Sequence, residues 1–254
     1  MELSTHRFNP WRFAHQFVGY WLVIFFYLPI MTLATLLSRE VWGPKMLRSW
    51  GRLMMANIGV RVHIEPAALR ELQKRRCRIL TFNHASTMDM FLMTVIWPSR
   101  GVAVVKREIL WIPVMGWMMR LLDFIPLNRG NREQAAKMMA EAASRMRLRE
   151  LSVIISPEGT RSPDGQLQRF KLGAFHMAAQ AQAPIIPLVL HGTAQLWPKW
   201  WQYSEPGVVT IRALPEIAPP ADPNDHEAIH AIAEDLRTRY ATELALMAAT
   251  VAWK

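Results

Sequence analysis

Residues 78–95 read RILTFNHASTMDMFLMTV and join a strand pattern to a helix pattern. The first five residues are mostly apolar and β-prone, which is typical of a short buried strand. A helical pattern starts at Met88, and Ser86 or Thr87 can cap that helix. We therefore expect His84 at a strand-to-helix turn, where α/β proteins often carry their functional side chains.

Five residues separate His84 from Asp89 along the chain. On a regular helix this spacing does not align two side chains, because neighbours lie three or four residues apart. With His84 in the turn and Asp89 in the first helical turns, the carboxylate can accept the proton of one imidazole nitrogen. The other nitrogen is then left as a base. Taken alone, the pair favours a structural hydrogen bond over a catalytic one.

Other apolar segments extend the strand and helix pattern along the chain. Strands are expected at 102–105, 124–127, 153–155 and 184–190, and helices at 44–58 and from Pro223 onwards. Gly59 is a stop signal for the first of these helices, and the second carries an apolar stripe that closes the domain. The pattern predicts an α/β fold with a central, largely parallel β-sheet flanked by helices.

A long uncharged run lies near the N-terminus, since residues 13–38 include no Lys, Arg, Asp or Glu. About 20 apolar residues cross a bilayer, so the length permits a transmembrane helix. Pro29 is expected to kink the run or divide it into two short helices. A hairpin entering one leaflet and a buried core helix are the alternatives, and basic residues on both flanks leave the orientation open. We assign residues 1–60 to membrane-associated helices and 61–254 to the α/β domain.

The composition also favours a protein that faces a membrane. Of 254 residues, 51% are hydrophobic and 11 are Trp, a side chain that favours the boundary between lipid and water. The net charge of +10 attracts polyanions, but the basic residues are dispersed and no nucleic-acid-binding signature accompanies them. Cys77 is the only cysteine, so neither an intrachain disulfide nor a cysteine-based zinc site can form.

His84 and Asp89 open a series of four sequence blocks. The blocks read NHASTMD at 83–89, FIPLNR at 124–129, PEGTRS at 157–162 with FKLG at 170–173, and PIIPLV at 184–189. In this order they resemble the signature motifs of the 1-acylglycerol-3-phosphate acyltransferase family. The resemblance covers about residues 77–189, and four blocks in the family's order argue against a chance match.

The resemblance implies an enzyme that moves a fatty acyl group from acyl-CoA or acyl carrier protein to the sn-2 hydroxyl of lysophosphatidic acid, giving phosphatidic acid. It implies that His84 removes the hydroxyl proton while Asp89 orients the ring. We expect no metal, no cofactor and no acyl-enzyme. The expected partners are the acyl donor, a lysophospholipid and the bilayer. The expected location is the inner (cytoplasmic) membrane, with the catalytic domain on its cytoplasmic side.

Two of the blocks depart from the family's pattern. Asp123, directly before the quoted second block, stands where the family usually has glycine, and Pro126 within it stands where an aromatic or aliphatic residue is usual. Ser156, directly before the quoted third block, stands where the family usually has phenylalanine. In the resembling family these positions border the acceptor and acyl sites. An acceptor such as a lyso-ornithine lipid is therefore an alternative within the enzyme class. A non-catalytic membrane-binding protein of the same fold is the alternative outside it.

The third block supplies a loop with a candidate substrate site, formed by Glu158, Gly159, Thr160 and Arg161. Gly159 lets the backbone turn tightly or approach a ligand, and the guanidinium of Arg161 suits a phosphate. Glu158 is expected to hydrogen-bond the acceptor or to hold Arg161 in place. A structural ion pair between Glu158 and Arg161 is an equal alternative.

Three further basic residues are candidates for binding the same phosphate, namely Arg129, Lys171 and Lys106. Each is also compatible with an ordinary solvated charge. The stretch 110–122 is rich in Met and other apolar residues, with Arg120 as its only charge. It is compatible with an acyl-chain tunnel, with entry into the membrane, or with an ordinary core helix.

Overall fold

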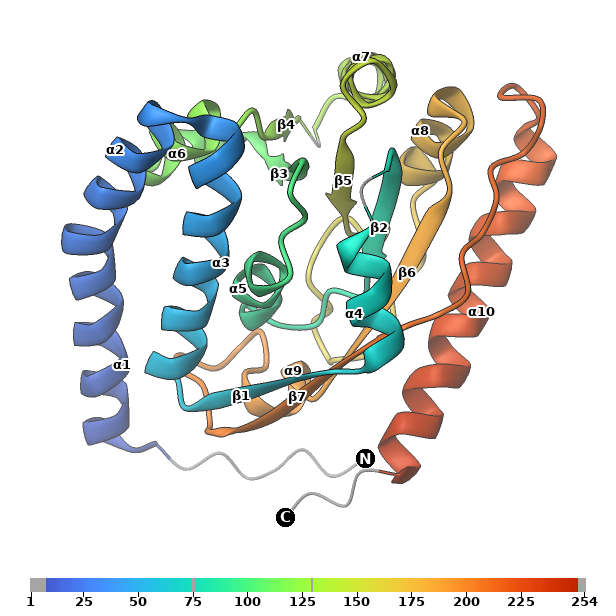
Figure 1. Cartoon of the computed structure of the whole chain (residues 1–254). Coiled ribbons are helices and arrows are strands. Elements are labelled where there is room, and N and C mark those ends of the chain that lie inside the picture. The colour runs from blue at the N-terminus through green and yellow to red at the C-terminus, as the bar shows by residue number, and fades with distance from the viewer. Residues whose placement is uncertain (1–7, 75, 129, 251–254) are drawn as a thin grey trace.

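The structure, a computed structural model, describes residues 8–74, 76–128 and 130–250. Figure 1 shows a central sheet with helices on both of its faces. Within the described residues the sheet has seven strands, in the order β1-β7-β6-β2-β5-β3-β4. The strands are β1 (Val60–Ile64), β2 (Arg78–Phe82), β3 (Gly101–Lys106), β4 (Ile125–Leu127), β5 (Ser152–Ile155), β6 (Ile185–His191) and β7 (Gly207–Ala213).

The strands from β6 to β4 in this order run parallel to one another. β7 is antiparallel to β6, and β1 is parallel to β7, so these two strands at one edge run against the others. The expected α/β fold with a largely parallel sheet is confirmed, although the sequence pattern did not predict β1 and β7. Because Thr81 of β2 is paired with Ile155 of β5, the loops that follow these two strands leave the sheet side by side.

Helices cover both faces of the sheet (Figure 1). The helices of the described residues are α1 (Pro10–Leu22), α2 (Leu28–Leu37), α3 (Arg39–Asn57), α4 (Pro66–Gln73), α5 (Met88–Val95), α6 (Met115–Leu121), α7 (Arg132–Arg149), α8 (Gly173–Ala181), α9 (Thr193–Leu196) and α10 (His226–Thr250). Of these, α1 and α2 pack against α3. Along β2, Leu80 and Phe82 join the apolar cluster of α3 and α5. Ile79 joins the opposite cluster with α7, α8 and α10, because successive strand side chains point to opposite faces.

The N-terminal run forms one uninterrupted helix of 28 residues, Pro10–Leu37, in which a π-helical turn at Val23–Tyr27 joins α1 to α2. The expectation that Pro29 divides it is wrong. The wider π turn ends at Tyr27, two residues before the proline, whose nitrogen has no hydrogen to donate. By length and hydropathy the helix is able to cross a membrane, and 17% of its most apolar window is buried. Large apolar side chains such as Phe25 and Phe26 are exposed, so it is not a buried core helix.

Asp123 links the start of α3 to α7. Its Oδ2 atom pairs with Arg39 of α3 at 2.6 Å, and with Arg145 and Arg149 of α7 at 3.4 and 3.3 Å. The φ angle of Asp123 is +59°, in the left-handed region that favours glycine. The backbone conformation thus accounts for the glycine that the resembling family usually has here. In this chain the carboxylate adds a structural contact between helices.

Two helix predictions need correction, and the structure also shows how the stretch 110–122, whose structure the sequence leaves open, is divided. α10 begins at His226 and not at Pro223, since the carboxylate of Asp225 caps it by accepting the Ala228 N–H at 2.9 Å. α3 begins at Arg39, with Pro44 inside it. The stretch 110–122 is not one helix, because a 3₁₀ turn at Arg107–Trp111 and α6 are separated near Val114, whose φ is +64°. The domain division between residues 60 and 61 stays a prediction, and α3 packs in the same apolar cluster as the sheet.

Candidate active site

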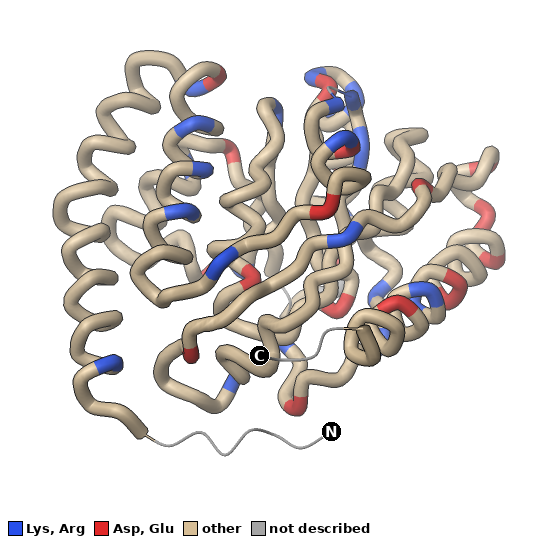
Figure 2. The backbone as a smooth tube through the Cα atoms, turned by 60° about the horizontal axis from the view of Figure 1, so that its bottom comes forward, with Lys and Arg blue, Asp and Glu red and all other residues tan. Residues whose placement is uncertain are grey.

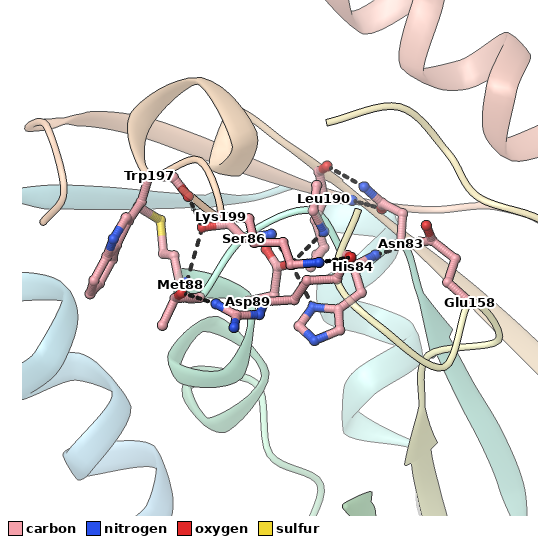
Figure 3. A network of polar contacts seen from close by, with 12 residues as sticks. Asn83, His84, Ser86, Met88, Asp89, Glu158, Leu190, Trp197 and Lys199 are labelled. Carbon is pink, nitrogen blue, oxygen red and sulfur yellow. Dashed lines mark hydrogen bonds and ion pairs between the residues drawn. The ribbon is translucent and has the colours of Figure 1, made fainter. Parts of the chain in front are cut away.

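His84 and Asp89 meet at the carboxyl end of β2 (Figure 3). The Nδ1 atom of His84 lies 2.9 Å from Oδ2 of Asp89. The same carboxylate oxygen accepts the backbone N–H groups of Ala85 and Ser86, both at 2.8 Å. The Asp89 side chain is 0% exposed and that of His84 is 21% exposed. Because Nδ1 donates its proton to the carboxylate, Nε2 is the nitrogen left to face a substrate.

The spacing of five residues works because the chain turns sharply between His84 and α5. Asp89 lies in the first turn of α5, where its carboxylate meets N–H groups that no helical carbonyl satisfies. The hydroxyl of Ser86 accepts the Met88 N–H at 3.0 Å and donates to the Trp197 carbonyl at 2.6 Å. Of the two predicted caps, Ser86 therefore fixes the turn, whereas Thr87 makes no capping hydrogen bond with its side chain.

Asn83 fastens this turn to the neighbouring strand β6. Its side-chain amide donates to the Leu190 carbonyl at 2.9 Å, and its side-chain oxygen accepts the Leu190 N–H at 2.8 Å. Asn83 is buried, so losing either bond would leave an unsatisfied polar group. The sequence pattern contained Asn83 in its first block but did not indicate this role, since Leu190 is far away along the chain.

Glu158 does not hold Arg161, contrary to one expectation. One of its carboxylate oxygens accepts the backbone N–H of His84 at 2.6 Å, and the other accepts the N–H of Gln168 at 2.9 Å. Burial raises the pKa of Glu158 to about 7, although both hydrogen bonds act to lower it. Glu158 therefore positions the backbone of the histidine, a role that no local spacing could have indicated across 74 residues.

Arg161 lies beside the histidine turn. Its guanidinium donates to the Thr87 hydroxyl, and its backbone carbonyl accepts a hydrogen bond from the ammonium of Lys199 at 3.2 Å. Lys199, which no local sequence pattern indicated for this site, reaches this loop from the segment after α9 (Figure 3). Two cationic side chains thus belong to the same edge as His84.

The other predicted substrate residues are placed less uniformly. Thr160 and Lys106 line the same cavity as His84 and Arg161, and Lys106 also pairs with Glu108 at 3.7 Å. Lys171 is exposed, and its side chain lies over Gly159. A Cβ atom added at Gly159 would come within 3.0 Å of the Cδ atom of Lys171. The φ of Gly159 is +68°, which agrees with the tight turn expected there. Arg129 lies outside the described residues, so its role stays a prediction.

A cavity of about 400 Å³ has His84, Thr160, Arg161 and Lys106 among its lining residues. Its size is within the range of roughly 300–1,000 Å³ that is typical of ligand sites. Thr160 and Lys106 are exposed, so we call this polar part of the lining the mouth of the cavity. Beyond the mouth the walls are largely apolar and come from α2, α3, α5, β3 and α6. Among the lining residues are Met31, Trp50, Met90, Val104, Met118 and Phe124. Within 110–122, Met115, Met118 and Met119 are buried and also line the cavity, so this stretch is both core and cavity wall.

Comparisons with known proteins agree with this geometry. The family model described as Acyltransferase matches residues 63–191. The chain is 36% identical to the 1-acyl-sn-glycerol-3-phosphate acyltransferase of Limnanthes alba over 167 aligned residues. These aligned residues cover 66% of this chain and 58% of that relative. The chain is also 30% identical to the alpha form of that enzyme from Homo sapiens over 229 aligned residues, which cover 89% of this chain and 78% of that relative.

A solved structure extends the similarity over the whole fold. The crystal structure of the 1-acyl-sn-glycerophosphate (LPA) acyltransferase PlsC from Thermotoga maritima matches with a TM-score of 0.78 at 25% identity, covering 97% of this chain and 98% of that one. The family match at 63–191 runs from β1 to the end of β6 and encloses His84, Glu158 and Arg161. The resemblance read from the four sequence blocks is thereby confirmed, and the chain belongs to the acyltransferase family.

Proposed function

We propose that this chain transfers a fatty acyl group from acyl-CoA or acyl carrier protein to the sn-2 hydroxyl of lysophosphatidic acid, forming phosphatidic acid. The observation that carries the proposal is the His84–Asp89 contact of 2.9 Å at the mouth of an apolar cavity. The names of the Limnanthes alba and human relatives support the same acceptor. No acyl-enzyme, metal or cofactor is part of the proposed reaction.

In the proposed step, Nε2 of His84 takes the proton of the acceptor hydroxyl as its oxygen attacks the thioester carbonyl. The new C–O bond forms and the C–S bond breaks. The proton on Nε2 passes to the departing thiolate, which leaves as a free thiol. Asp89 holds the ring through Nδ1 and stabilises the transient imidazolium, while Glu158 fixes the backbone beneath it.

The cavity supplies a place for the acyl chain. Its walls are apolar, and unbranched Met side chains such as Met90 and Met118 adapt to a flexible hydrocarbon. A chain seated there places its thioester near His84, because the imidazole lines the mouth of the cavity.

The acceptor phosphate is assigned to the basic residues beside the histidine. Arg161 offers a planar fork for phosphate oxygens, and Thr160 and Lys106 line the same mouth. Lys171 and Arg129 complete the proposed set, with Gly159 letting the backbone come close.

We further propose that the protein lies on the inner (cytoplasmic) membrane with its catalytic domain on the cytoplasmic side. The helix Pro10–Leu37 exposes a broad apolar surface, and α2 contacts α6. Near α6, Trp111 is 68% exposed and Trp117 is 65% exposed, which suits the boundary between lipid and water. The helices α2 and α6 also line the cavity at His84, so an acyl chain has a short apolar route from the lipid to His84.

Turnover measured with purified protein over a small matrix of substrates tests the proposal. The donors are a long-chain acyl-CoA and the matching acyl carrier protein thioester, and the acceptors are lysophosphatidic acid and a lyso-ornithine lipid. His84→Ala should abolish turnover. The matched variant His63→Ala, at an exposed position on β1, should not.

Each alternative has its own outcome in the same matrix. Faster turnover of the lyso-ornithine lipid than of lysophosphatidic acid would overturn the proposed acceptor. Absence of turnover with every pair, together with normal vesicle binding by the wild type and by His84→Ala, would favour a non-catalytic membrane-binding protein.

A further inference from the structure

A second cavity, called the groove below, lies away from His84, between α3, β1 and α4. Its volume is about 780 Å³, larger than that of the cavity at His84. The two cavities share Trp97, which is 3% exposed and stacked on Phe124 with 5.1 Å between ring centroids. The groove is therefore separate from the proposed acyl site, and a rigid indole stands between them.

Part of the lining of this groove is apolar. β1 is an edge strand, paired only with β7 among the described strands, and its Val62 and Ile64 line the groove. Leu69 and Leu72 of α4 face them, and Leu69 is 46% exposed. Such a surface is costly to leave in water, and a hydrocarbon chain would cover it.

Three arginines also line the groove, Arg48 and Arg52 on α3 and Arg61 on β1. Within the part of the chain that the structure describes, none of them makes an ion pair. The nearest acidic side chains along β1 and α4 are already paired, Glu65 with Arg212 and Glu71 with Lys74 and Arg76. Figure 2 shows the order of the basic residues along the backbone, with successive blue segments on α3 that continue to the start of β1.

Arg48 is the most constrained of the three. Its guanidinium donates to the Trp97 carbonyl at 2.8 Å. Burial, and after it the charge of Arg52, lower the pKa of Arg48. Positive charge thus lines the groove without an ion-pair partner among the described residues, which is an arrangement that attracts a phosphate.

We propose that this groove is a binding site for an anionic phospholipid, with the lipid phosphate on Arg52 and Arg61 and an acyl chain along β1 and α4. An inorganic anion would satisfy the arginines but leave the apolar wall exposed. An acidic polypeptide would do the same, whereas an anionic lipid matches both the basic and the apolar lining residues. The volume lies within the roughly 300–1,000 Å³ of typical ligand sites. The site is distinct from catalysis and does not depend on the proposed acyl transfer.

The test measures binding of dioctanoyl phosphatidylglycerol to the full-length protein in non-ionic detergent, by native mass spectrometry or calorimetry. Dioctanoyl phosphatidylcholine, inorganic phosphate and poly-glutamate are the comparison probes. The charge variant is Arg52→Gln with Arg61→Gln, which spares Arg48 and its structural bond. Its matched control is Lys137→Gln with Arg147→Gln, which removes the same charge from exposed positions on α7. Leu69→Trp fills the apolar side without changing charge.

We expect the charge variant to weaken phosphatidylglycerol binding by about tenfold or more, the factor that corresponds to losing one charge-assisted hydrogen bond. Leu69→Trp should also weaken it, and the α7 control should not. Equal binding by the charge variant and its control, or equal binding of phosphatidylcholine, would overturn the proposal. Inorganic phosphate or poly-glutamate binding as tightly as the lipid would overturn the lipid assignment, in favour of a simple anion site or an acidic protein partner.

Discussion

The substitution Asp89→Asn separates two roles of the Asp89 carboxylate. The first is to accept the hydrogen bond of His84 Nδ1, and the second is to supply a negative charge beside the imidazole. In this structure one oxygen of Asp89, Oδ2, accepts the hydrogen bonds of His84 Nδ1, Ala85 N–H and Ser86 N–H. The other oxygen, Oδ1, is buried and has no hydrogen-bond partner among the described residues. An asparagine can therefore keep all of these bonds by placing its oxygen at the Oδ2 position. The histidine tautomer should survive, and only the negative charge is lost.

The size of the effect follows from that charge. A unit charge about 4 Å from the imidazolium centre is worth about 4 kcal/mol at the effective dielectric constant of a partly exposed site. The imidazolium is only partly formed in the transition state. We therefore expect kcat to fall by about 10²- to 10³-fold. The amide nitrogen at the Oδ1 position has no acceptor, so the free energy of unfolding should also fall, by about 1–3 kcal/mol.

The assay is kcat for acyl transfer to lysophosphatidic acid, with the free energy of unfolding measured on the same preparations. Asp225→Ala is the stability control, because removal of this helix cap costs about 1 kcal/mol at a distance from the site. Asp225→Ala should leave kcat unchanged. An Asp89→Asn enzyme within about threefold of the wild type would refute a role for the charge. A loss as complete as that of His84→Ala would refute the single-oxygen argument, since it would mean that the tautomer had changed.

Three other expectations follow from the same geometry. The pKa of Glu158 is raised from 4.5 to about 7, so the folded protein binds this proton more tightly than the unfolded chain. Its contribution to stability is therefore lost as the pH rises through this interval, by at most about 3 kcal/mol, and Glu158→Gln should remove that part of the pH dependence in urea denaturation at pH values from about 5 to about 8. If the free energy of unfolding of Glu158→Gln depended on pH as it does in the wild type, this expectation would be contradicted. Arg161→Gln should raise KM for lysophosphatidic acid by about tenfold or more and leave KM for acyl-CoA unchanged, whereas equal changes in both would contradict a phosphate contact. Ala103→Phe, which narrows the cavity, should shift the preferred donor to shorter acyl chains in a chain-length series, and an unchanged preference would place the acyl chain elsewhere.

Local sequence determined the elements at the centre of the fold. The strand predicted at 78–82 is β2, and the helical pattern from Met88 is α5, because periodicity and turn residues act within a few positions. The close approach of His84 and Asp89 was predictable for the same reason, since both belong to one turn. Less could be read where the decisive contact is distant. The directions of β1 and β7 depend on which strands they pair with in the sheet, and these partners are distant along the chain. The π turn before Pro29 depends on whether the helix continues past the proline.

The sequence by itself indicated the central chemical groups of the site, because the blocks carry His84, Asp89, Glu158 and Arg161 in order, whereas Lys199 lies outside them. Only the tertiary structure decided what each group does. Parallel pairing of β2 with β5 brings Glu158 under the backbone of His84, which is why this carboxylate positions the histidine and does not pair with Arg161. The apolar cavity likewise exists only where α2, α3, α5, β3 and α6 meet. Short-range patterns specify strands and turns, whereas cavities and buried hydrogen bonds arise between segments that only folding brings together.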